Sequence, residues 1–346
     1  MAEPIVIGGI AVMPGERKQL QLPVANLYTD TQVSIPVQVI RAKQPGPTVF
    51  VSAAVHGDEI NGIEIIRRLI QTKITLTHGT LLLVPMVNVY GVINQSRYLP
   101  DRRDLNRCFP GSPTGSLAAR LAHTFLSEIV KHCQFGIDLH TGAIHRSNLP
   151  QIRANIADEQ TAKLAKAFGV PVLLNSDLRD GSLREAAIDL GTRILLYEAG
   201  EALRFDELSI QSGLKGILNV LSELGMVRKR RGRKSEPFVA NRSEWIRANA
   251  SGIVQEFVHL GHAVSAGDVL AEINSPLGEN IQQLRSNRAG IIIGKQEIPL
   301  VQEGEAMYHI AYFGDAADEV AEHIEMMQEQ LDEQVPQPLT QSRIAP

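Results

Sequence analysis

Residues 49–59 are Val49-Phe50-Val51-Ser52-Ala53-Ala54-Val55-His56-Gly57-Asp58-Glu59, an apolar run followed at once by a polar turn. The apolar run has the length and composition of a buried β-strand. Two candidate ligands three positions apart, His56 and Glu59, then lie at its carboxyl end, where open α/β sheets build their sites. Zinc takes both residue types as ligands in proteins, so this fragment predicts part of a metal site.

Two later fragments repeat the pattern of an apolar run, a His or Glu, and a turn containing glycine. They are Asp138-Leu139-His140-Thr141-Gly142 and Tyr197-Glu198-Ala199-Gly200. A zinc ion in a hydrolase takes three protein ligands and keeps a fourth position for water, and a further carboxylate must move the proton of that water. His56, Glu59 and His140 supply the ligand set, and Glu198 fits the role of the proton-moving carboxylate.

Each fragment taken alone has a plainer explanation. A His at a strand end is more often a hydrogen-bonded loop residue than a ligand, and a His and a Glu three positions apart occur by chance in many chains. Asp138 is either a surface carboxylate or helix cap, or it orients a zinc ligand through a hydrogen bond. A fourth fragment favours the functional interpretation, because four arginines and one asparagine there are candidates for binding anions and polarising a carbonyl: Arg97-Tyr98-Leu99-Pro100-Asp101-Arg102-Arg103-Asp104-Leu105-Asn106-Arg107.

The composition is that of an ordinary globular protein. The 346 residues are 44% hydrophobic and 21% charged, which is enough to bury a sizeable core in about two domains. A net charge of −4 argues against nucleic acid or an anionic membrane as a partner. The absence of a signal-like start and of a long apolar window predicts a cytoplasmic protein. Cys108 and Cys133 are expected to be free thiols, with Cys133 the more buried.

The chain divides into three predicted parts. Up to about residue 225, β-branched runs alternate with helical patterns, which predicts an α/β domain with a mixed, mostly parallel sheet flanked by helices. We place this domain at residues 1–235, a β domain at 236–314, and a helical and then disordered tail at 315–346. A basic run at 228–234 is interpreted as a solvated linker or an interface loop, since it has no interleaved aromatic residues of the kind that bind nucleic acid.

The predicted β domain contains an internal repeat. Each copy begins a strand with glycine, at Gly252 and at Gly290, and continues with an apolar pattern that is Val264, Gly267, Leu270 and Ile273 in the first copy and Val301, Gly304, Met307 and Ile310 in the second. Two similar β units predict a pseudo-symmetric β-sandwich or barrel. The pattern resembles the barrel-sandwich hybrid of lipoyl and biotinyl domains, but the hairpin at 274–278 has no lysine to carry such a group.

As a set, the four fragments resemble the succinylglutamate desuccinylase/aspartoacylase family, a branch of the zinc carboxypeptidase-like fold. The resemblance covers roughly residues 45–225 and rests on His56-Gly57-Asp58-Glu59, Asp104-Leu105-Asn106-Arg107 with Phe109-Pro110-Gly111, Asp138-Leu139-His140, and Glu198. It implies one Zn²⁺ per chain bound by His56, Glu59 and His140. It also implies that Glu198 acts first as general base and then as general acid.

The same resemblance implies roles for the arginine-rich fragment. Asn106 and Arg107 match an Asn-Arg pair that holds the substrate carboxylate. Arg97 matches the arginine of an Arg-Tyr pair and is the preferred candidate for polarising the scissile carbonyl. Two extra residues before Asp104 leave Arg102 and Arg103 as alternatives, and Arg103 is also a candidate for binding the substrate. Outside this fragment, Arg153 either contacts a substrate carboxylate or is solvated.

The function expected from this resemblance is the zinc-dependent hydrolysis of the amide bond of an N-acyl amino acid or a related small N-acyl compound. One alternative is a metallocarboxypeptidase that acts on short peptides. Another is a zinc-binding scaffold without catalysis, which the free carboxylate of Glu198 disfavours. Neither the acyl group nor the amino acid is specified, and a homo-oligomer is left open.

Overall fold

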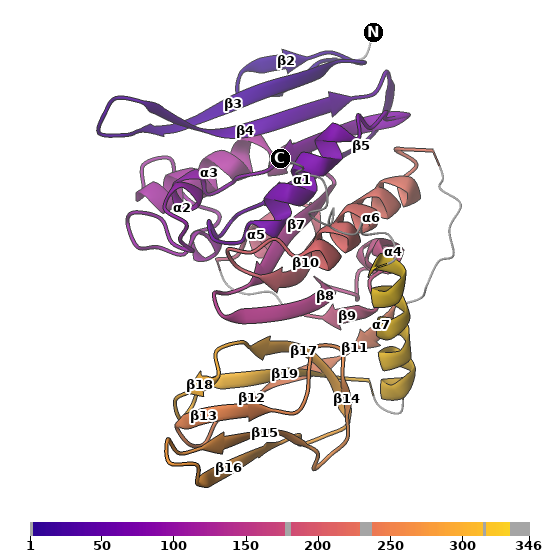
Figure 1. The fold of residues 1–346 in the computed structure, drawn as a ribbon. Coiled ribbons are helices and arrows are strands. Elements are labelled where there is room, and N and C mark those ends of the chain that lie inside the picture. Colours follow the sequence, from indigo (N-terminus) through magenta and orange to yellow (C-terminus); the bar gives the residue numbers. More distant parts are fainter. Residues whose placement is uncertain (1–2, 177–180, 229–236, 314–315, 333–346) are drawn as a thin grey trace, which may run out of the picture.

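The computed structural model describes residues 3–176, 181–228, 237–313 and 316–332. A large mixed sheet runs through the molecule in the strand order β12-β19-β17-β8-β10-β7-β5-β6-β4-β3 (Figure 1). Four neighbouring strands are parallel: β10 (Arg193–Glu201), β7 (Phe135–Gly142), β5 (Gln44–Ala53) and β6 (His78–Val84). Antiparallel strands flank them, namely β4 (Gln32–Arg41), β3 (Arg17–Asn26) and β8 (Arg146–Ala154). The predicted mixed α/β sheet is therefore confirmed.

Helices cover both faces of this sheet. The helices α1 (Asn61–Gln71), α4 (Glu159–Phe168) and α6 (Glu207–Glu223) share one apolar core, whereas α3 (Leu117–Glu128) and α5 (Leu183–Asp189) share another core with β1 (Ile5–Ile7) and β2 (Ile10–Val12). Within β5, Val49 and Val51 enter the first core and Phe50 enters the second. A strand covered on both faces must be apolar throughout, which explains the uninterrupted run that precedes His56.

Three short helical segments follow β6 and α3 along the chain. They are α2 (Val89–Ile93), the 3₁₀ turn Leu105–Arg107 and the 3₁₀ turn Val130–His132. Among the described helices, none combines the length and the apolar character that crossing a membrane requires. The cytoplasmic location remains a prediction.

The C-terminal strands pair the two copies of the predicted internal repeat with each other. In the four-stranded sheet β16 (Asn280–Arg285), β15 (Val269–Asn274), β13 (Gly252–Glu256) and β18 (Leu300–Val301), Gly252 lies opposite Val301. In the large sheet, β17 (Gly290–Gln296) pairs with β14 (Ala263–Val264) so that Gly290 lies opposite Val264. The first strand of each copy thus pairs with a strand of the other copy, β13 with β18 and β17 with β14. Within the described residues no ladder joins the two sheets, so the pairing does not show a closed barrel.

The C-terminal strands extend the large sheet rather than standing apart from it. β17 pairs with β8, and β19 (Ala306–Tyr312) and β12 (Arg242–Arg247) follow it outward. Two further strands, β9 (Val172–Asn175) and β11 (Phe238–Ala240), pair beside β8. The helix α7 (Ala317–Asp332) adds Val320 and Ile324 to an apolar cluster that both parts of the chain share.

Several predictions about connecting segments fall outside the described residues. These are the boundary at residue 235, most of the basic run at 228–234, and the tail after residue 332. The three-part division of the chain therefore stays a prediction.

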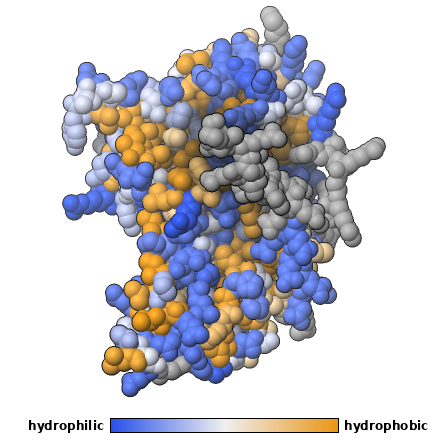
Figure 2. All heavy atoms as spheres, viewed as in Figure 1, coloured by the Kyte–Doolittle hydropathy of each residue, from blue (hydrophilic) through white to orange (hydrophobic). Residues whose placement is uncertain are grey.

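On the face drawn in Figure 2, hydrophobic and hydrophilic residues are intermingled over both the upper strands and the C-terminal strands.

Candidate metal centre and active site

The strand register brings the three predicted strand ends together. In the parallel pair of β7 and β10, His140 lies opposite Glu198, and in the pair of β5 and β7, Ala53 lies opposite Leu139. Because the carboxyl ends of parallel strands meet at one edge, residues far apart in the sequence become neighbours there.

The turn after β5 is fixed by close backbone approach. Ala54 has a positive φ of 53°, and the amide of Glu59 donates to the carbonyl of His56 at 3.1 Å. A Cβ atom at Gly57 would lie 1.9 Å from the carbonyl carbon of Gly91 in α2, so only glycine fits. This packing holds His56 and Glu59 on one side of the turn.

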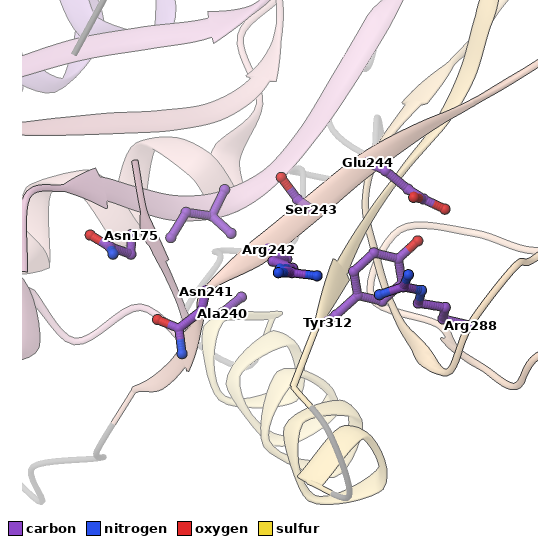
Figure 3. Close-up of a pocket in the computed structure, with 9 residues that line it drawn as sticks. Asn175, Ala240, Asn241, Arg242, Ser243, Glu244, Arg288 and Tyr312 are labelled. Atoms are coloured by element: carbon purple, nitrogen blue, oxygen red, sulfur yellow. The ribbon is translucent and has the colours of Figure 1, made fainter. Parts of the chain in front are cut away.

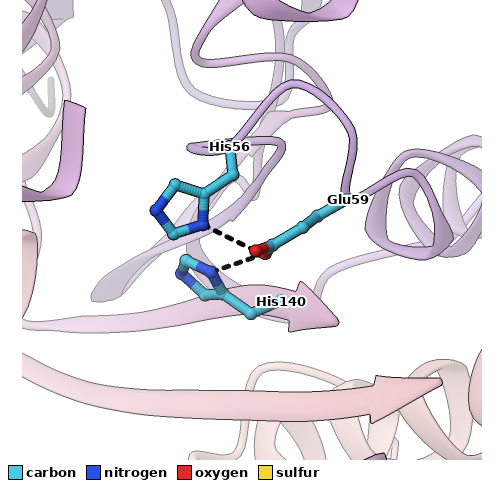
Figure 4. A group of neighbouring side chains, drawn as sticks. All are labelled: His56, Glu59 and His140. Atoms are coloured by element: carbon cyan, nitrogen blue, oxygen red, sulfur yellow. Dashed lines mark hydrogen bonds and ion pairs between the residues drawn. The ribbon is translucent and has the colours of Figure 1, made fainter. Parts of the chain in front are cut away.

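Three buried side chains converge at this edge (Figure 4). Nδ1 of His56 lies 2.7 Å from Oε1 of Glu59, and Nδ1 of His140 lies 2.8 Å from Oε2 of the same carboxylate. The backbone amide of Thr141 also donates to Glu59 Oε2 at 3.2 Å. One ligand atom from each of His56, Glu59 and His140 lies within 4.8 Å of the others, which is compatible with a shared metal ion.

The opposite nitrogen of each imidazole is held by a carboxylate. Nε2 of His56 lies 3.1 Å from Asp104, and Nε2 of His140 lies 2.7 Å from Asp138, which also accepts from Ser52 at 2.7 Å. These contacts favour the tautomer with the proton on Nε2, so both Nδ1 lone pairs point toward the Glu59 carboxylate. In that tautomer three electron-pair donors face one another, an arrangement that could hold a cation, and this donor set suits zinc.

The electrostatic environment of Glu59 also favours a positive charge beside its carboxylate. Burial acts to raise the pKa of Glu59, but the His56 and His140 rings outweigh it and hold that pKa well below its usual range. Burial likewise acts to lower the pKa of His140, and Asp138 and Glu59 outweigh it and raise that pKa well above its usual value. The centre therefore favours an ionised carboxylate and a positive charge beside it.

The structure separates the three candidate arginines. Arg97 lies 3.3 Å from Glu59 Oε1, donates to Asp104 at 3.0 Å, and lines the cavity beside the metal ligands. Arg102 is an exposed turn residue with a positive φ of 61°. Arg103 has a side chain that is 59% exposed and lies beside Asp101, away from the cavity lining. The tight turn at Leu99–Arg103 directs both residues outward, so the geometry does not support the predicted substrate contact of Arg103.

Asn106 and Arg107 both line the cavity, as expected for substrate-binding residues. The side-chain oxygen of Asn106 accepts from the amide of Leu183 at 2.9 Å, and its backbone amide donates to Asp104 at 2.8 Å. The guanidinium of Arg107 donates to the carbonyl of Asn106. Asn106 thus ties this loop to the start of α5, which leaves its amide nitrogen for other contacts.

Glu198 lies on the same cavity and is held from the neighbouring strand β8. Nδ2 of Asn148 donates to its Oε2 at 2.8 Å, and Nε of Arg153 lies 3.8 Å from its Oε1. Arg153 therefore faces the cavity, which resolves the alternative of a solvated surface residue. The carboxylate of Glu198 is not among the three clustered ligands, as a proton-moving group requires.

The cavity has a volume of about 260 Å³ and includes residues that sequence reasoning missed. Trp245 of β12 reaches it from the C-terminal strands, with the guanidinium of Arg146 at 5.4 Å from the centre of its ring and His309 stacked on the ring at 4.7 Å. Arg184 of α5 also lines the cavity. No sequence motif marks these residues, because they reach the site through sheet pairing and helix packing.

A larger cavity of about 380 Å³ lies elsewhere, beside β9, β11 and β12 (Figure 3). Within the described parts of the chain, its lining includes Arg242, Glu244, Arg288 and Tyr312, but no histidine and a single carboxylate. Such a set does not form a three-ligand metal centre. The smaller cavity, which holds the His-Glu-His cluster, is therefore the candidate active site.

The fold and the buried His-Glu-His cluster define a mixed α/β protein with a candidate metal centre at the carboxyl edge of its sheet. The family model "Succinylglutamate desuccinylase/Aspartoacylase catalytic domain" matches residues 45–224, which is more than half of the chain. The chain belongs to this family, as its motifs predicted.

Known relatives match nearly the whole chain. An N-alpha-acetyl-L-2,4-diaminobutyric acid deacetylase from Halomonas elongata is 27% identical over 308 residues, covering 84% of this chain and 90% of the relative. The product-bound structure of the ectoine utilization protein EutE (DoeB) from Ruegeria pomeroyi is 25% identical with a TM-score of 0.76, covering 90% and 99%. A succinylglutamate desuccinylase structure from Silicibacter sp. has the same TM-score at 24% identity, covering 86% and 95%, and shows a shared fold.

Proposed function

We propose that this protein is a zinc-dependent hydrolase that removes the acyl group from a small N-acyl amino acid. The observation that carries the proposal is the convergence of His56, Glu59 and His140 in a cavity that also holds Glu198, a carboxylate outside the ligand set. Family membership and the 27% identical deacetylase support the same reaction class.

The metal centre would be held by Nδ1 of both histidines and the carboxylate of Glu59, with Asp104 and Asp138 fixing the two rings. When bound, zinc supplies Lewis acidity and lowers the pKa of water to about 7. Glu198 takes a proton from the attacking water and delivers it to the departing amine nitrogen.

Two groups of the arginine-rich loop complete the proposed site. Arg97 lies against Glu59, close enough to the ligands to stabilise negative charge on the scissile carbonyl oxygen. Arg107 has no carboxylate partner within the described part of the chain, so its guanidinium is available for a substrate carboxylate, with Asn106 beside it. Arg103 has no role in this proposal.

The cavity favours a small anionic substrate. Among the described residues, five arginines line it (Arg97, Arg107, Arg146, Arg153 and Arg184) together with three carboxylates (Glu59, Asp138 and Glu198). A metal ion held by the three ligands would add further positive charge. Trp245 bounds the cavity from the C-terminal strands, and a volume of about 260 Å³ suits a small molecule better than a peptide chain. These features favour a deacylase over a carboxypeptidase.

The proposal is tested with a panel of substrates and the zinc-loaded full-length protein. N-acetyl and N-succinyl derivatives of aspartate, glutamate and 2,4-diaminobutyrate are compared with short peptides, and the release of free amine is measured. We expect efficient release from at least one N-acyl amino acid and little from the peptides. Efficient removal of C-terminal residues from peptides would establish a carboxypeptidase instead, and no turnover of any compound would support a scaffold.

A further inference from the structure

The proposed general base is held at both of its oxygens by a single neighbouring strand. β8 pairs antiparallel with β10 so that Gln151 lies opposite Glu198, with a register shift before Asn148 lies opposite Gly200. From this strand, Asn148 donates to one oxygen of Glu198 at 2.8 Å, and Arg153 lies 3.8 Å from the other. The direction of the Glu198 carboxylate therefore depends on where β8 places Asn148.

The other side of β8 is occupied by a strand from the C-terminal repeat. β17 pairs antiparallel with β8, and Gly294 lies directly opposite Asn148. One residue earlier, the carbonyl of Ile293 accepts a hydrogen bond at 3.2 Å from the fully buried side chain of Gln151. Asn148 itself is only 8% exposed. The amide of Asn148 is thus enclosed between β17 and the carboxylate that it binds.

The contact between Gly294 and Asn148 leaves no space for a side chain. A Cβ atom at Gly294 would lie 2.9 Å from Oδ1 of Asn148, closer than Cβ contacts in proteins normally are. The backbone of Gly294 has no positive φ, so its conformation does not demand glycine. Close approach of other atoms explains the glycine: Oδ1 of Asn148 is the nearest atom to such a Cβ, and Cβ of His309 follows at 3.2 Å.

The internal repeat shows that this strand of the repeat does not itself need a glycine at the position of Gly294. Counted from Gly252 and Gly290, which begin the equivalent strands β13 and β17, the first copy has Glu256 where the second has Gly294. The first copy does not pair with β8. Glycine therefore occurs in the copy that faces the active site.

From these contacts we propose that Asn148 is a positioning residue for Glu198 and that Gly294 of the C-terminal strands sets the position of Asn148. This inference rests on the proposed function, because it concerns the carboxylate that moves the proton. The inference gives the C-terminal strands a part in catalysis. Through their pairing with β8 they align the general base, although they contain none of the catalytic motifs.

Two substitutions test the two contacts separately. Asn148→Ala removes the donor, so the Glu198 carboxylate swings toward Arg153 and kcat falls roughly 10- to 100-fold while KM changes less than about twofold. Gly294→Ala places a methyl group against Oδ1 of Asn148, the end of a side chain that can move. It should therefore reproduce the Asn148→Ala phenotype while the protein stays folded and retains zinc.

The decisive experiment is a double-mutant cycle of the two substitutions on the zinc-loaded full-length protein. Once Asn148 is truncated, the added methyl group no longer meets its side-chain oxygen and keeps only the wider 3.2 Å contact with Cβ of His309, so the double variant should have a kcat close to that of Asn148→Ala alone. If each single substitution lowered kcat and the two losses multiplied in the double variant, the proposal would be overturned. An Asn148→Ala variant with raised KM and unchanged kcat would also overturn it. Lys295→Gln is the matched control, because this neighbouring side chain bonds Glu256 on β13 and should alter stability but not kcat.

Thermal unfolding of the wild type, the two single variants and the double variant provides a readout that needs no substrate. Gly294→Ala should lower Tm in the wild-type background and much less in the Asn148→Ala background. Coupling in Tm without any hydrolase activity would refute the proposed function while confirming the contact. Activity without coupling in either readout would refute the positioning role alone.

Discussion

Nε2 of His140 donates a hydrogen bond to Oδ2 of Asp138 at 2.7 Å, and this contact turns Nδ1 of the same ring toward Glu59. The two residues are separated by a single position in β7, so their side chains lie on the same face of the strand. His56 is oriented in the same way by Asp104 from a distant loop. Both candidate histidine ligands are therefore aimed by carboxylates that are not ligands themselves.

Asp138→Ala should weaken zinc binding roughly 10- to 100-fold, because the His140 ring loses the group that fixes its tautomer. Asp138→Asn should restore part of this affinity, since its side-chain oxygen can still accept from Nε2. Zinc affinity measured by competition with a chelator checks the prediction. Unchanged affinity in Asp138→Ala would mean that the hydrogen bond does not orient a ligand.

Glu198→Gln should keep a full equivalent of zinc but lower kcat by roughly 10²- to 10⁴-fold, because the amide cannot accept the proton of the attacking water. Metal analysis and steady-state kinetics on the same preparation separate the two effects. Retained turnover would remove the proposed role of Glu198. Loss of zinc would instead identify it as a ligand.

Arg97→Lys should lower kcat by roughly 10²- to 10³-fold, since a lysine cannot replace a guanidinium that contacts Glu59 and Asp104 while facing the substrate. Arg103→Lys is the matched control from the same loop and should keep kcat and KM within about twofold, because its side chain is exposed. A larger loss of kcat in Arg103→Lys than in Arg97→Lys would place Arg103 at the substrate.

Glu64→Gln tests an ion-pair network that supports α1, the helix after the metal motif. Arg67 and then Arg68 lower the pKa of Glu64 to about 2, against an opposing effect of burial. A carboxylate with a lowered folded-state pKa adds stability that is complete above its unfolded value of about 4.3 and fades as pH falls toward 2.

We therefore expect Glu64→Gln to lower Tm by roughly 2–4 °C at pH 7, which corresponds to about 1 kcal/mol. The difference from wild type should shrink between pH 4.5 and pH 3. Glu319→Gln, an exposed site on α7, serves as the control and should leave Tm nearly unchanged. A difference that grows on acidification would contradict the ion-pair account.

The candidate metal centre was predictable because its residues lie at or just after the carboxyl ends of strands, and the pattern of buried parallel strands indicates where those ends meet. His56, Glu59, His140 and Glu198 all follow such runs, and the structure brings them to one cavity. The preference for Arg97 came from the family motif, and the exposed turn at Arg102 and Arg103 supports it. Cys133, expected to be buried, is 5% exposed.

Apart from Asp138, which the sequence offered as one candidate for orienting a ligand, the supporting groups were not predictable, because their contacts depend on packing between distant segments. Asp104 reaches His56 across 48 positions from a loop without regular structure. Trp245 and Gly294 reach the site only because the C-terminal strands continue the catalytic sheet through β8. The repeat in the sequence predicted a symmetric β unit, but it contained no signal of which copy would face the active site.

The most direct test of the central claim is a zinc titration of metal-free protein with amine release from the best N-acyl amino acid as the readout. We predict no activity without metal, full activity at one equivalent of zinc, and no restoration in His56→Ala at that concentration. Activity in the metal-free protein, or a His56→Ala variant that binds one equivalent as tightly as wild type, would contradict the assignment of His56, Glu59 and His140 as the catalytic zinc site.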